Sequence, residues 1–455
     1  MVKEKTDLKK RFIHRAKIGN TVYEVVTWKG TSVFLCYTKG KGFHLENSIE
    51  TYQEILYPMP KRGLPYRDYK LTEQVWKQLE AGKINVDKQQ LYLEIFDKID
   101  TYLVTNPAYK ALIVAQILES YIQFKFNAVG YIFFTGSQDS GKSRACELIQ
   151  FLSYRPMFGL SLNASNIYNY IGCDEENEGQ VTIIEDEFAE INRNEAFDRL
   201  KIYRSGYRRG NSVPRILDAG SSQRMQVFYR TFCSKIFNGY KLPKDSAFQS
   251  RCIEIPMSTG EPECDEVLPE HLPDFDEIKF KALIWRMQTY FDPLPQMEIK
   301  LSGRMKEIWK CKMYAVHGTT AEEEIKNLAY KDIKQKVEEL HETLECRVIE
   351  AVLTETNYFG YGLPIPFKVI WSRLLKVLDM TQNDYDNLAE RGAVFAEGID
   401  KSISHVTVGR ILLNVIHGIR KHGGKEIGRV YSFDKDTVER LAKKYQIEVK
   451  NTAKQ

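Results

Sequence analysis

Several features of secreted, disulfide-bonded and membrane-spanning proteins are missing from this 455-residue sequence. Its eight cysteines form no Cys-x-x-Cys pair, so we expect neither a disulfide framework nor a zinc site, and a reducing cytoplasm is the default compartment. The best apolar run, residues 111–118, is far shorter than the ~18 apolar residues of a membrane helix. The basic residues 1–19 lack the apolar segment of a signal peptide. The sequence therefore predicts a cytoplasmic protein with no membrane partner.

The composition is that of a folded protein with an uneven charge. Hydrophobic residues make up 43% and charged residues 28% of the chain, a balance that excludes disordered, collagen-like and coiled-coil classes. The net charge is only +4. Residues 401–455 carry twelve Lys or Arg and five Asp or Glu, residues 201–230 carry seven and one, and residues 261–280 carry one and eight. Two basic patches in a nearly neutral chain indicate a polyanionic partner.

The order of predicted elements indicates an α/β protein with smaller flanking units. Residues 21–28 and 31–37 read as short strands, and the spacing of apolar residues becomes helical near residue 71. The apolar run YIFFTG at 131–136 is typical of a buried parallel strand, and helical and strand patterns alternate from there to about residue 257. The predicted parts are a small β-rich domain at 1–75, a helical segment at 76–128, an α/β core at 129–260, an acidic connector (261–278) and helical lid within 261–345, and a C-terminal domain at 346–455.

A phosphate-binding motif follows the YIFFTG strand. The sequence GSQDSGKS fits the pattern GxxxxGK[ST] at every fixed position, with a strand predicted before it and a helix after it. Backbone N–H groups of such a loop point at phosphates, while Lys142 neutralises their charge and the Ser143 hydroxyl ligates Mg²⁺. ATP and Mg²⁺ are the expected cofactors. The expected ATP contacts in this loop are Gly136, Ser137, Gln138, Asp139, Ser140, Gly141, Lys142 and Ser143.

An apolar strand ending in three acidic residues follows, at 181–187. Asp186 suits a contact with Mg²⁺, either direct or through a water ligand of the ion, and Glu187 suits polarisation of the attacking water. Glu185 allows a register shifted by one residue, so the assignment within Glu185-Asp186-Glu187 stays open at this point.

These two motifs, together with the segments KIFNGY and LPKDSAFQSRCIEI, resemble the AAA+ class of ring-forming P-loop ATPases. The resemblance implies that Asn238 contacts the nucleophilic water and that Arg251 is an arginine finger acting on the γ-phosphate of a neighbouring subunit. It also implies a homo-oligomer, expected to be a hexameric ring. A second arginine near the γ-phosphate corresponds in this sequence to Arg304, in the segment SGRMKE of the predicted lid.

More narrowly, the block from AVGYIFFTGSQDSGKS through RSGYRRGNSVPR to SRCIEIPM is similar to the ATPase domain of plasmid, phage and integrative-element replication proteins. These proteins are relatives of the minichromosome-maintenance and superfamily 3 helicases, and the resemblance covers roughly residues 100–310. It implies a DNA helicase. About 100 residues before the core are too few for a primase domain, so any priming would come from a separate primase or polymerase.

Two basic segments are candidates for DNA contact. Residues 213–217 and 224–231 read as a β-hairpin, and in the helicases that the chain resembles a hairpin there grips the DNA backbone. The C-terminal unit resembles a winged helix, with a helix at 406–417 and a basic glycine turn after it, although winged helices also dock proteins. The candidate DNA-binding residues are Arg208, Arg209, Arg215 and Arg224 in the first segment, and Arg420, Lys421 and Lys425 in the second.

The sequence leaves three functions open. The first is an ATP-driven, ring-forming DNA helicase or translocase for replication of a plasmid, virus or integrated mobile element. The second is an ATP-switched initiator or helicase loader that remodels origin DNA without processive unwinding. The third is an AAA+ protein remodeler, against which the hairpin arginines and the winged-helix pattern count.

Overall fold

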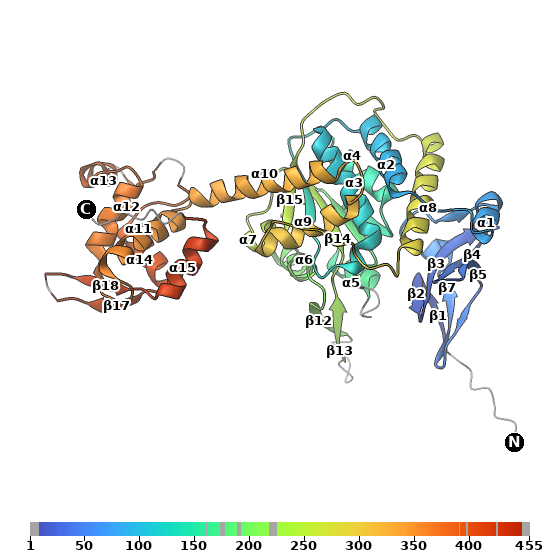
Figure 1. Ribbon diagram of the computed structural model, residues 1–455, viewed down its shortest axis with the longest axis horizontal. Helices are drawn as coiled ribbons and strands as arrows, with labels where there is room; N and C mark the ends of the chain where they lie inside the picture. The colour runs from blue at the N-terminus through green and yellow to red at the C-terminus, as the bar shows by residue number, and fades with distance from the viewer. Residues whose placement is uncertain are drawn as a thin grey trace, which may run out of the picture. The chain divides into compact units, whose positions relative to one another are not determined.

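The computed structural model describes residues 9–160, 162–172, 178–188, 193–217, 225–390, 392–396, 399–424 and 426–447. The chain divides into two units, Met1–Leu328 and Ala329–Gln455, and each is described by itself (Figure 1). The finer division into five parts stays a prediction. Among the described helices, none combines the length and hydropathy that a bilayer span would need.

The first unit begins with two small β-sheets. The strands expected at 21–28 and 31–37 are confirmed as β3 (Thr21–Trp28) and β4 (Thr31–Thr38), and both are rich in the β-branched and aromatic residues that strands favour. Buried side chains that include Phe34 and Cys36 pack against Ile49 and Leu56 of the other sheet. The first sheet also holds β2 (Arg15–Ile18), β5 (Gly42–Glu46) and β8 (Lys70–Leu71), and the second holds β1 (Lys9–Ile13), β7 (Glu54–Pro58) and β6 (Ile49–Glu50).

Three helices lead from these sheets into the core. Helix α3 contains the apolar run 111–118 and is buried from Ala111 to its end, so that run is a core helix. Its start is set by Asn106, whose side chain caps the Ala108 N–H, and by a proline in the first turn. The bounds are α1 (Glu73–Glu80), α2 (Lys88–Tyr102) and α3 (Pro107–Ile122).

The core of this unit is a five-stranded parallel sheet, with the strand order β10-β11-β14-β9-β15. Because all strands are parallel, their carboxyl ends meet at one edge, where ligands bind in open α/β sheets. The strands are β9 (Tyr131–Thr135), β10 (Pro156–Leu160), β11 (Thr182–Asp186), β14 (Ser234–Gly239) and β15 (Cys252–Pro256); the intervening helices are α4 (Lys142–Leu152), α5 (Ala164–Ile171), α6 (Arg193–Ser205) and α7 (Ser246–Gln249).

A hairpin and two further helices complete the first unit. The predicted hairpin is present as β12 (Ser212–Leu217) and β13 (Met225–Arg230), which pair antiparallel and project from the body of the unit (Figure 1). Helix α8 (Leu272–Gln288) packs against α2, α3 and α4, and α9 (Gly303–Val316) packs against α3. The acidic segment 261–278 is a connector only in its first part. Helix α8 begins at Leu272, six residues earlier than expected, and its first turns are packed through the buried Phe275.

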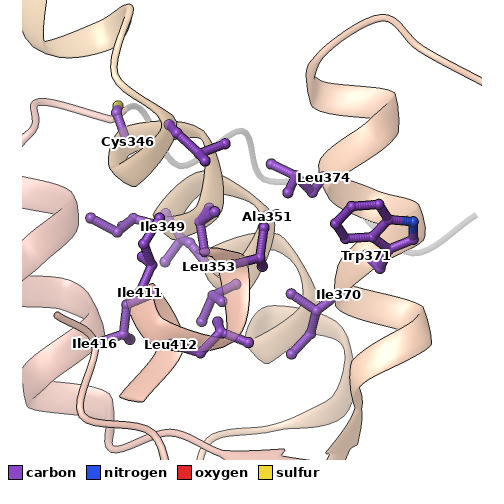
Figure 2. Packing of buried hydrophobic residues seen from close by; sticks show 14 of the residues in the cluster. Cys346, Ile349, Ala351, Leu353, Ile370, Trp371, Leu374, Ile411, Leu412 and Ile416 are labelled. Atoms are coloured by element: carbon purple, nitrogen blue, oxygen red, sulfur yellow. The ribbon is translucent and has the colours of Figure 1, made fainter. Parts of the chain in front are cut away.

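The second unit is mainly helical and has its own core. Buried side chains of α11 (Leu344–Phe359), α12 (Phe367–Val377) and α14 (His405–Asn414) form one cluster, and Figure 2 shows Ile349, Ile370 and Ile411 among them, one from each helix. A small antiparallel sheet, β16-β18-β17, closes the unit. After α10 (Glu322–His341), which crosses the boundary between the units, come α11 (Leu344–Phe359), β16 (Ile365–Pro366), α12 (Phe367–Val377), α13 (Gln382–Ala389), α14 (His405–Asn414), β17 (Ile419–His422), β18 (Arg429–Ser432) and α15 (Lys435–Lys444).

Candidate nucleotide site

The loop between β9 and α4 has the backbone geometry of an anion site. Gly136 has φ 153°, and a Cβ there would lie 2.5 Å from the carbonyl oxygen of Met257, so only glycine fits. Gly141 has φ 82° and caps the first turn of α4, whose N–H groups open toward the loop. The loop borders a cleft of about 440 Å³ that is also lined by residues 102–104 and by residues following β15. The loop and the helix start can therefore receive a polyphosphate.

Lys142 places its ammonium group inside this loop. Its Nζ donates hydrogen bonds to the Gly136 carbonyl at 3.0 Å, to the Ser140 hydroxyl at 3.1 Å and to the Ser137 carbonyl. No carboxylate of the described residues forms an ion pair with Lys142. Its positive charge is held in position by neutral groups and stays available to a phosphate.

Ser143 and Asp186, the expected Mg²⁺ ligands, lie side by side. The Ser143 hydroxyl donates to Asp186 Oδ1 at 3.0 Å. Asp186 ends β11, the neighbour of β14 in the sheet, and its carboxylate also accepts a hydrogen bond from Asn238 Nδ2. A hydroxyl and a carboxylate oxygen are the donors that Mg²⁺ prefers, so these two residues fit that ion.

Asn238 connects the acidic strand end to the next strand. Its Oδ1 accepts the Glu187 N–H at 2.6 Å, and its backbone carbonyl accepts the Phe188 N–H at 2.7 Å. Glu187 is exposed and has φ 54°, an uncommon backbone conformation for a non-glycine residue. These bonds hold the Glu187 backbone in that conformation. The Asn238 side chain is buried, and besides Asp186 it is hydrogen-bonded to the thiol of Cys146.

Glu185 lies on the opposite face of β11, because successive side chains of a strand alternate. Its fully buried carboxylate pairs with Arg199 and accepts the Tyr203 hydroxyl, both from α6. Burial raises the pKa of Glu185 to about 7, although Arg199 and the tyrosine hydrogen bond oppose that rise. Asp186, by contrast, faces the Ser143 hydroxyl at the start of α4, and the roles of the three acidic residues stay predictions.

Arg251 and Arg304 come together, but far from the phosphate loop of their own chain. Arg251 directly precedes β15, whose first residue pairs with the first residue of β9, whereas the loop follows the last residue of β9. Five residues at about 3.3 Å each separate the two edges by about 16 Å. The expected contact of Arg304 with ATP stays a prediction, and the structure places this residue beside Arg251.

The two arginines share one aromatic ring. Arg251 and Arg304 lie 4.5 Å and 5.3 Å from the centre of the Tyr207 ring, and Arg304 Nη1 donates to the Ser250 hydroxyl at 2.5 Å. Burial, and then the charge of Arg304, lower the pKa of Arg251. Arg251 Nε is buried without a hydrogen-bond partner, and neither arginine forms an ion pair with a described carboxylate. The pair can therefore bind an external anion.

The described arginines near the hairpin mostly contact the chain itself. Arg209 donates to the carbonyls of Phe124 and Phe126, and Arg208 lies 3.6 Å from Glu307. Arg215 stands 4.7 Å from the Tyr168 ring and donates to Ser165. Arg224 lies outside the described residues. Of the described three, Arg209 and Arg215 bind groups of the chain, the side chain of Arg208 is 56% exposed, and their contact with DNA stays a prediction.

The outward face of the hairpin carries apolar side chains that the arginine count did not indicate. Antiparallel pairing puts Pro214 opposite Phe228 and Ile216 opposite Gln226 on one face. The side chains of Ile216 and Phe228 are 59% and 52% exposed. The signal in the sequence is the alternation in β12 and β13, whose other face packs Tyr229 on Tyr168 of α5.

In the second unit, the predicted basic residues are exposed. Arg420 and Lys421 lie on β17, all four of whose residues are exposed, and neither has an ion-pair partner among the described residues. Arg429 on β18 and Arg410 on α14 are exposed as well. Lys425 lies outside the described part of the chain.

Comparison with known proteins gives distant structural neighbours. No protein-family model and no curated protein matches the sequence. Among solved structures, the chain resembles the NrS-1 C-terminal region (TM-score 0.31, 11% identity, 90% of this chain and 96% of that chain) and the active helicase SCCmec type IV Cch (TM-score 0.33, 12% identity, 91% and 80%). It also resembles the JCV helicase (TM-score 0.21, 15% identity, 49% and 67%). These TM-scores and identities are too low to assign a function to the chain.

Proposed function

We propose that the chain is an ATP-dependent, ring-forming DNA helicase of the AAA+ class, which serves replication of a plasmid, virus or integrated mobile element. The observation that carries the proposal is the connection Ser143–Asp186–Asn238–Glu187 behind the phosphate loop. It links two neighbouring strand ends to the start of α4, so that a nucleotide, a metal ion and a water each have matching groups.

Within one chain, the loop N–H groups and Lys142 bind the β- and γ-phosphates. Ser143 and Asp186 would hold Mg²⁺, which neutralises charge on the phosphates when it is bound. Glu187 projects from the strand end and accepts the proton of the attacking water, while Asn238 orients the Glu187 backbone and contacts that water. Glu185 supports this arrangement from behind the sheet through Arg199.

The arginine pair completes the site from a neighbouring subunit. Arg251 and Arg304 lie at the sheet edge opposite their own phosphate loop, where they are held by Tyr207 and have no described counterion. A ring that joins one edge to the opposite edge of the next subunit brings both arginines to the γ-phosphate. Negative charge that develops there is stabilised by such arginines.

DNA would be held in two places. The hairpin offers Phe228, and aromatic rings bind single strands by stacking on bases. We propose that the second unit binds duplex DNA as a winged helix does, with α14 as the groove-binding helix and β17 and β18 as the wing. The free cations Arg420 and Lys421 on β17 fit a phosphate backbone.

One observation favours the alternative, an ATP-switched initiator or helicase loader. The described hairpin arginines bind groups of the chain itself, whereas unpaired cations are found on the second unit, where they suit duplex DNA. An initiator needs duplex docking more than it needs a moving grip on a single strand.

Strand displacement on a forked duplex tests the proposal. The wild-type chain should hydrolyse ATP and separate the strands, and Asp186→Asn should do neither, because its carboxylate is lost from the Mg²⁺ position. Hydrolysis stimulated by DNA without displacement would favour the initiator or loader. A wild-type chain that does not hydrolyse ATP would contradict both.

A further inference from the structure

Three side chains of different chemistry meet on the small N-terminal sheet. The thiol of Cys36, the imidazole of His44 and the carboxylate of Glu46 each offer one ligand atom, and these atoms lie within 4.8 Å of one another. The described residues contain no second group of this kind. The nucleotide site uses none of the three.

Their meeting follows from the pairing of β4 with β5. Cys36 of β4 is directly opposite His44 of β5, so their side chains lie on the same face of the sheet. Glu46 is opposite Phe34 and two residues along β5 from His44, and side chains two residues apart on a strand share a face. Directly opposed side chains have Cβ atoms about 4.5–5.5 Å apart. His44 Nε2 already lies 3.2 Å from Glu46 Oε1. The register therefore holds the three groups together without any special loop.

The three groups make few contacts outside their own cluster. Cys36 Sγ lies 3.6 Å from the Phe34 carbonyl and is hydrogen-bonded to the backbone of Glu46, and the ion pair of Glu46 within the described chain is with His44. Cys36 is fully buried, whereas the side chains of His44 and Glu46 are 41% and 35% exposed on the edge strand β5. An ion can enter from solvent over β5 and reach the sulfur at the rim of the core.

We propose that Cys36, His44 and Glu46 form a zinc site that braces the edge strand β5. Thiolate, imidazole and carboxylate together select Zn²⁺ over Mg²⁺ or Ca²⁺, which prefer oxygen ligands. Zinc bound tetrahedrally at about 2.0–2.3 Å needs ligand atoms about 3.2–3.8 Å apart. His44 and Glu46 meet that spacing, and rotation of their half-exposed side chains brings Cys36 Sγ into range. A water completes the fourth position.

Cobalt is the probe for the test, because a Co²⁺–thiolate bond gives a charge-transfer band in the near ultraviolet. The full chain, stripped of metal with a chelator and kept free of nucleotide, is titrated with Co²⁺. One equivalent should produce the band together with the intense visible bands of tetrahedral cobalt, and Zn²⁺ should displace it. Cobalt bound at Ser143 and Asp186 has only oxygen ligands and gives no thiolate band.

Variants assign the ligands. Cys36→Ser should abolish the band, and His44→Gln or Glu46→Gln should weaken Co²⁺ binding by more than about 100-fold, the upper loss caused by removing even an outer partner of a metal ligand. Cys264→Ser, at a half-buried cysteine outside the cluster, should leave the titration unchanged. Glu46→Gln changes a half-exposed side chain, so it decides the question if Cys36→Ser does not fold. Absence of the band in the wild type, or its full retention in Glu46→Gln, would overturn the zinc site.

Discussion

The two edges of the central sheet carry opposite chemistry. At the carboxyl ends of the strands lie the phosphate loop, Asp186 and Glu187, which we propose to bind a nucleotide and its metal. At the amino ends lie Arg251 and Arg304, which are cations without a described counterion. About 16 Å of strand separates the edges, at about 3.3 Å per residue. Neither edge carries both sets of groups, and the proposed function therefore needs two subunits to make one hydrolysis site.

The largest effect should come from the amino-end edge. Arg251→Ala should lower kcat for ATP by about 10³-fold or more, the contribution of an arginine finger, while the Kd for ATP changes little. Steady-state hydrolysis and fluorescent-nucleotide binding measure the two quantities. Lys306→Ala, an exposed cation two residues beyond Arg304, is the control and should keep normal turnover. A normal kcat in Arg251→Ala would show that the arginines at the amino ends of the strands take no part in hydrolysis.

At the carboxyl-end edge, two neighbouring glutamates should behave differently. Glu187→Gln should lower kcat by about 10²–10⁴-fold and keep ATP binding, because the general base is lost. Glu185→Gln should keep hydrolysis by the folded protein within about threefold, because Glu185 lies on the opposite face of β11 from Asp186; loss of its buried ion pair with Arg199 should instead lower the free energy of unfolding. Single-turnover hydrolysis separates the two. Loss of activity in Glu185→Gln alone would mean that the register is shifted by one residue.

Arg304 should contribute less than Arg251. Arg304→Ala should reduce kcat by about 10-fold, because a charge-assisted hydrogen bond contributes about 1.5–3 kcal/mol and Arg251 remains. The same substitution also removes positive charge beside Arg251, so the assay is repeated with Arg304→Lys, which restores that charge. Partial recovery of kcat in the lysine variant is expected. Equal loss in both would show that the planar guanidinium is what matters.

For the hairpin, we expect DNA binding to depend on the exposed ring of Phe228 rather than on the arginines. Phe228→Ala should weaken single-stranded DNA binding by about 10-fold, in line with about 1–3 kcal/mol per stacked base, and should leave basal hydrolysis intact. Fluorescence anisotropy with a labelled single strand measures the change. Gln226→Ala lies on the same outward face and is the control. If binding falls equally in both variants, the exposed ring has no special part.

The smallest effect should concern the second unit. Arg420→Ala with Lys421→Ala should weaken duplex binding and reduce the slope of log K against log salt by about 0.9 per lost contact. The charge-matched control is Arg440→Ala with Lys443→Ala, two exposed cations of α15. An unchanged salt slope in the first variant would remove β17 from the DNA surface.

The phosphate site could be predicted from the sequence because its information is local. Eight consecutive residues specify the loop, and a strand ending in acidic residues places Asp186 at the same edge. The register within 185–187 could not be predicted, since it depends on which face of β11 meets Arg199 and Tyr203 of α6. The catalytic roles of these residues stay predictions.

The remaining differences arise from contacts between segments distant in the sequence. Counting arginines did not reveal that Arg209 binds the Phe124 carbonyl or that Arg304 lies against Tyr207. The expectation that the chain has no zinc site rested on cysteine spacing in the sequence, whereas Cys36 and His44 become neighbours only through strand pairing. Side-chain partners of this kind are set by the fold, and no short pattern encodes them.

If each hydrolysis site is shared between two subunits, mixing two inactive variants should restore activity. Lys142→Ala removes the phosphate-loop charge and Arg251→Ala removes the finger, so each protein alone should be inactive. Mixed rings contain interfaces that pair an intact loop with an intact Arg251, and the account predicts that hydrolysis returns at intermediate ratios. No recovery at any ratio, with mixed assemblies shown to form, would contradict a site built from two subunits.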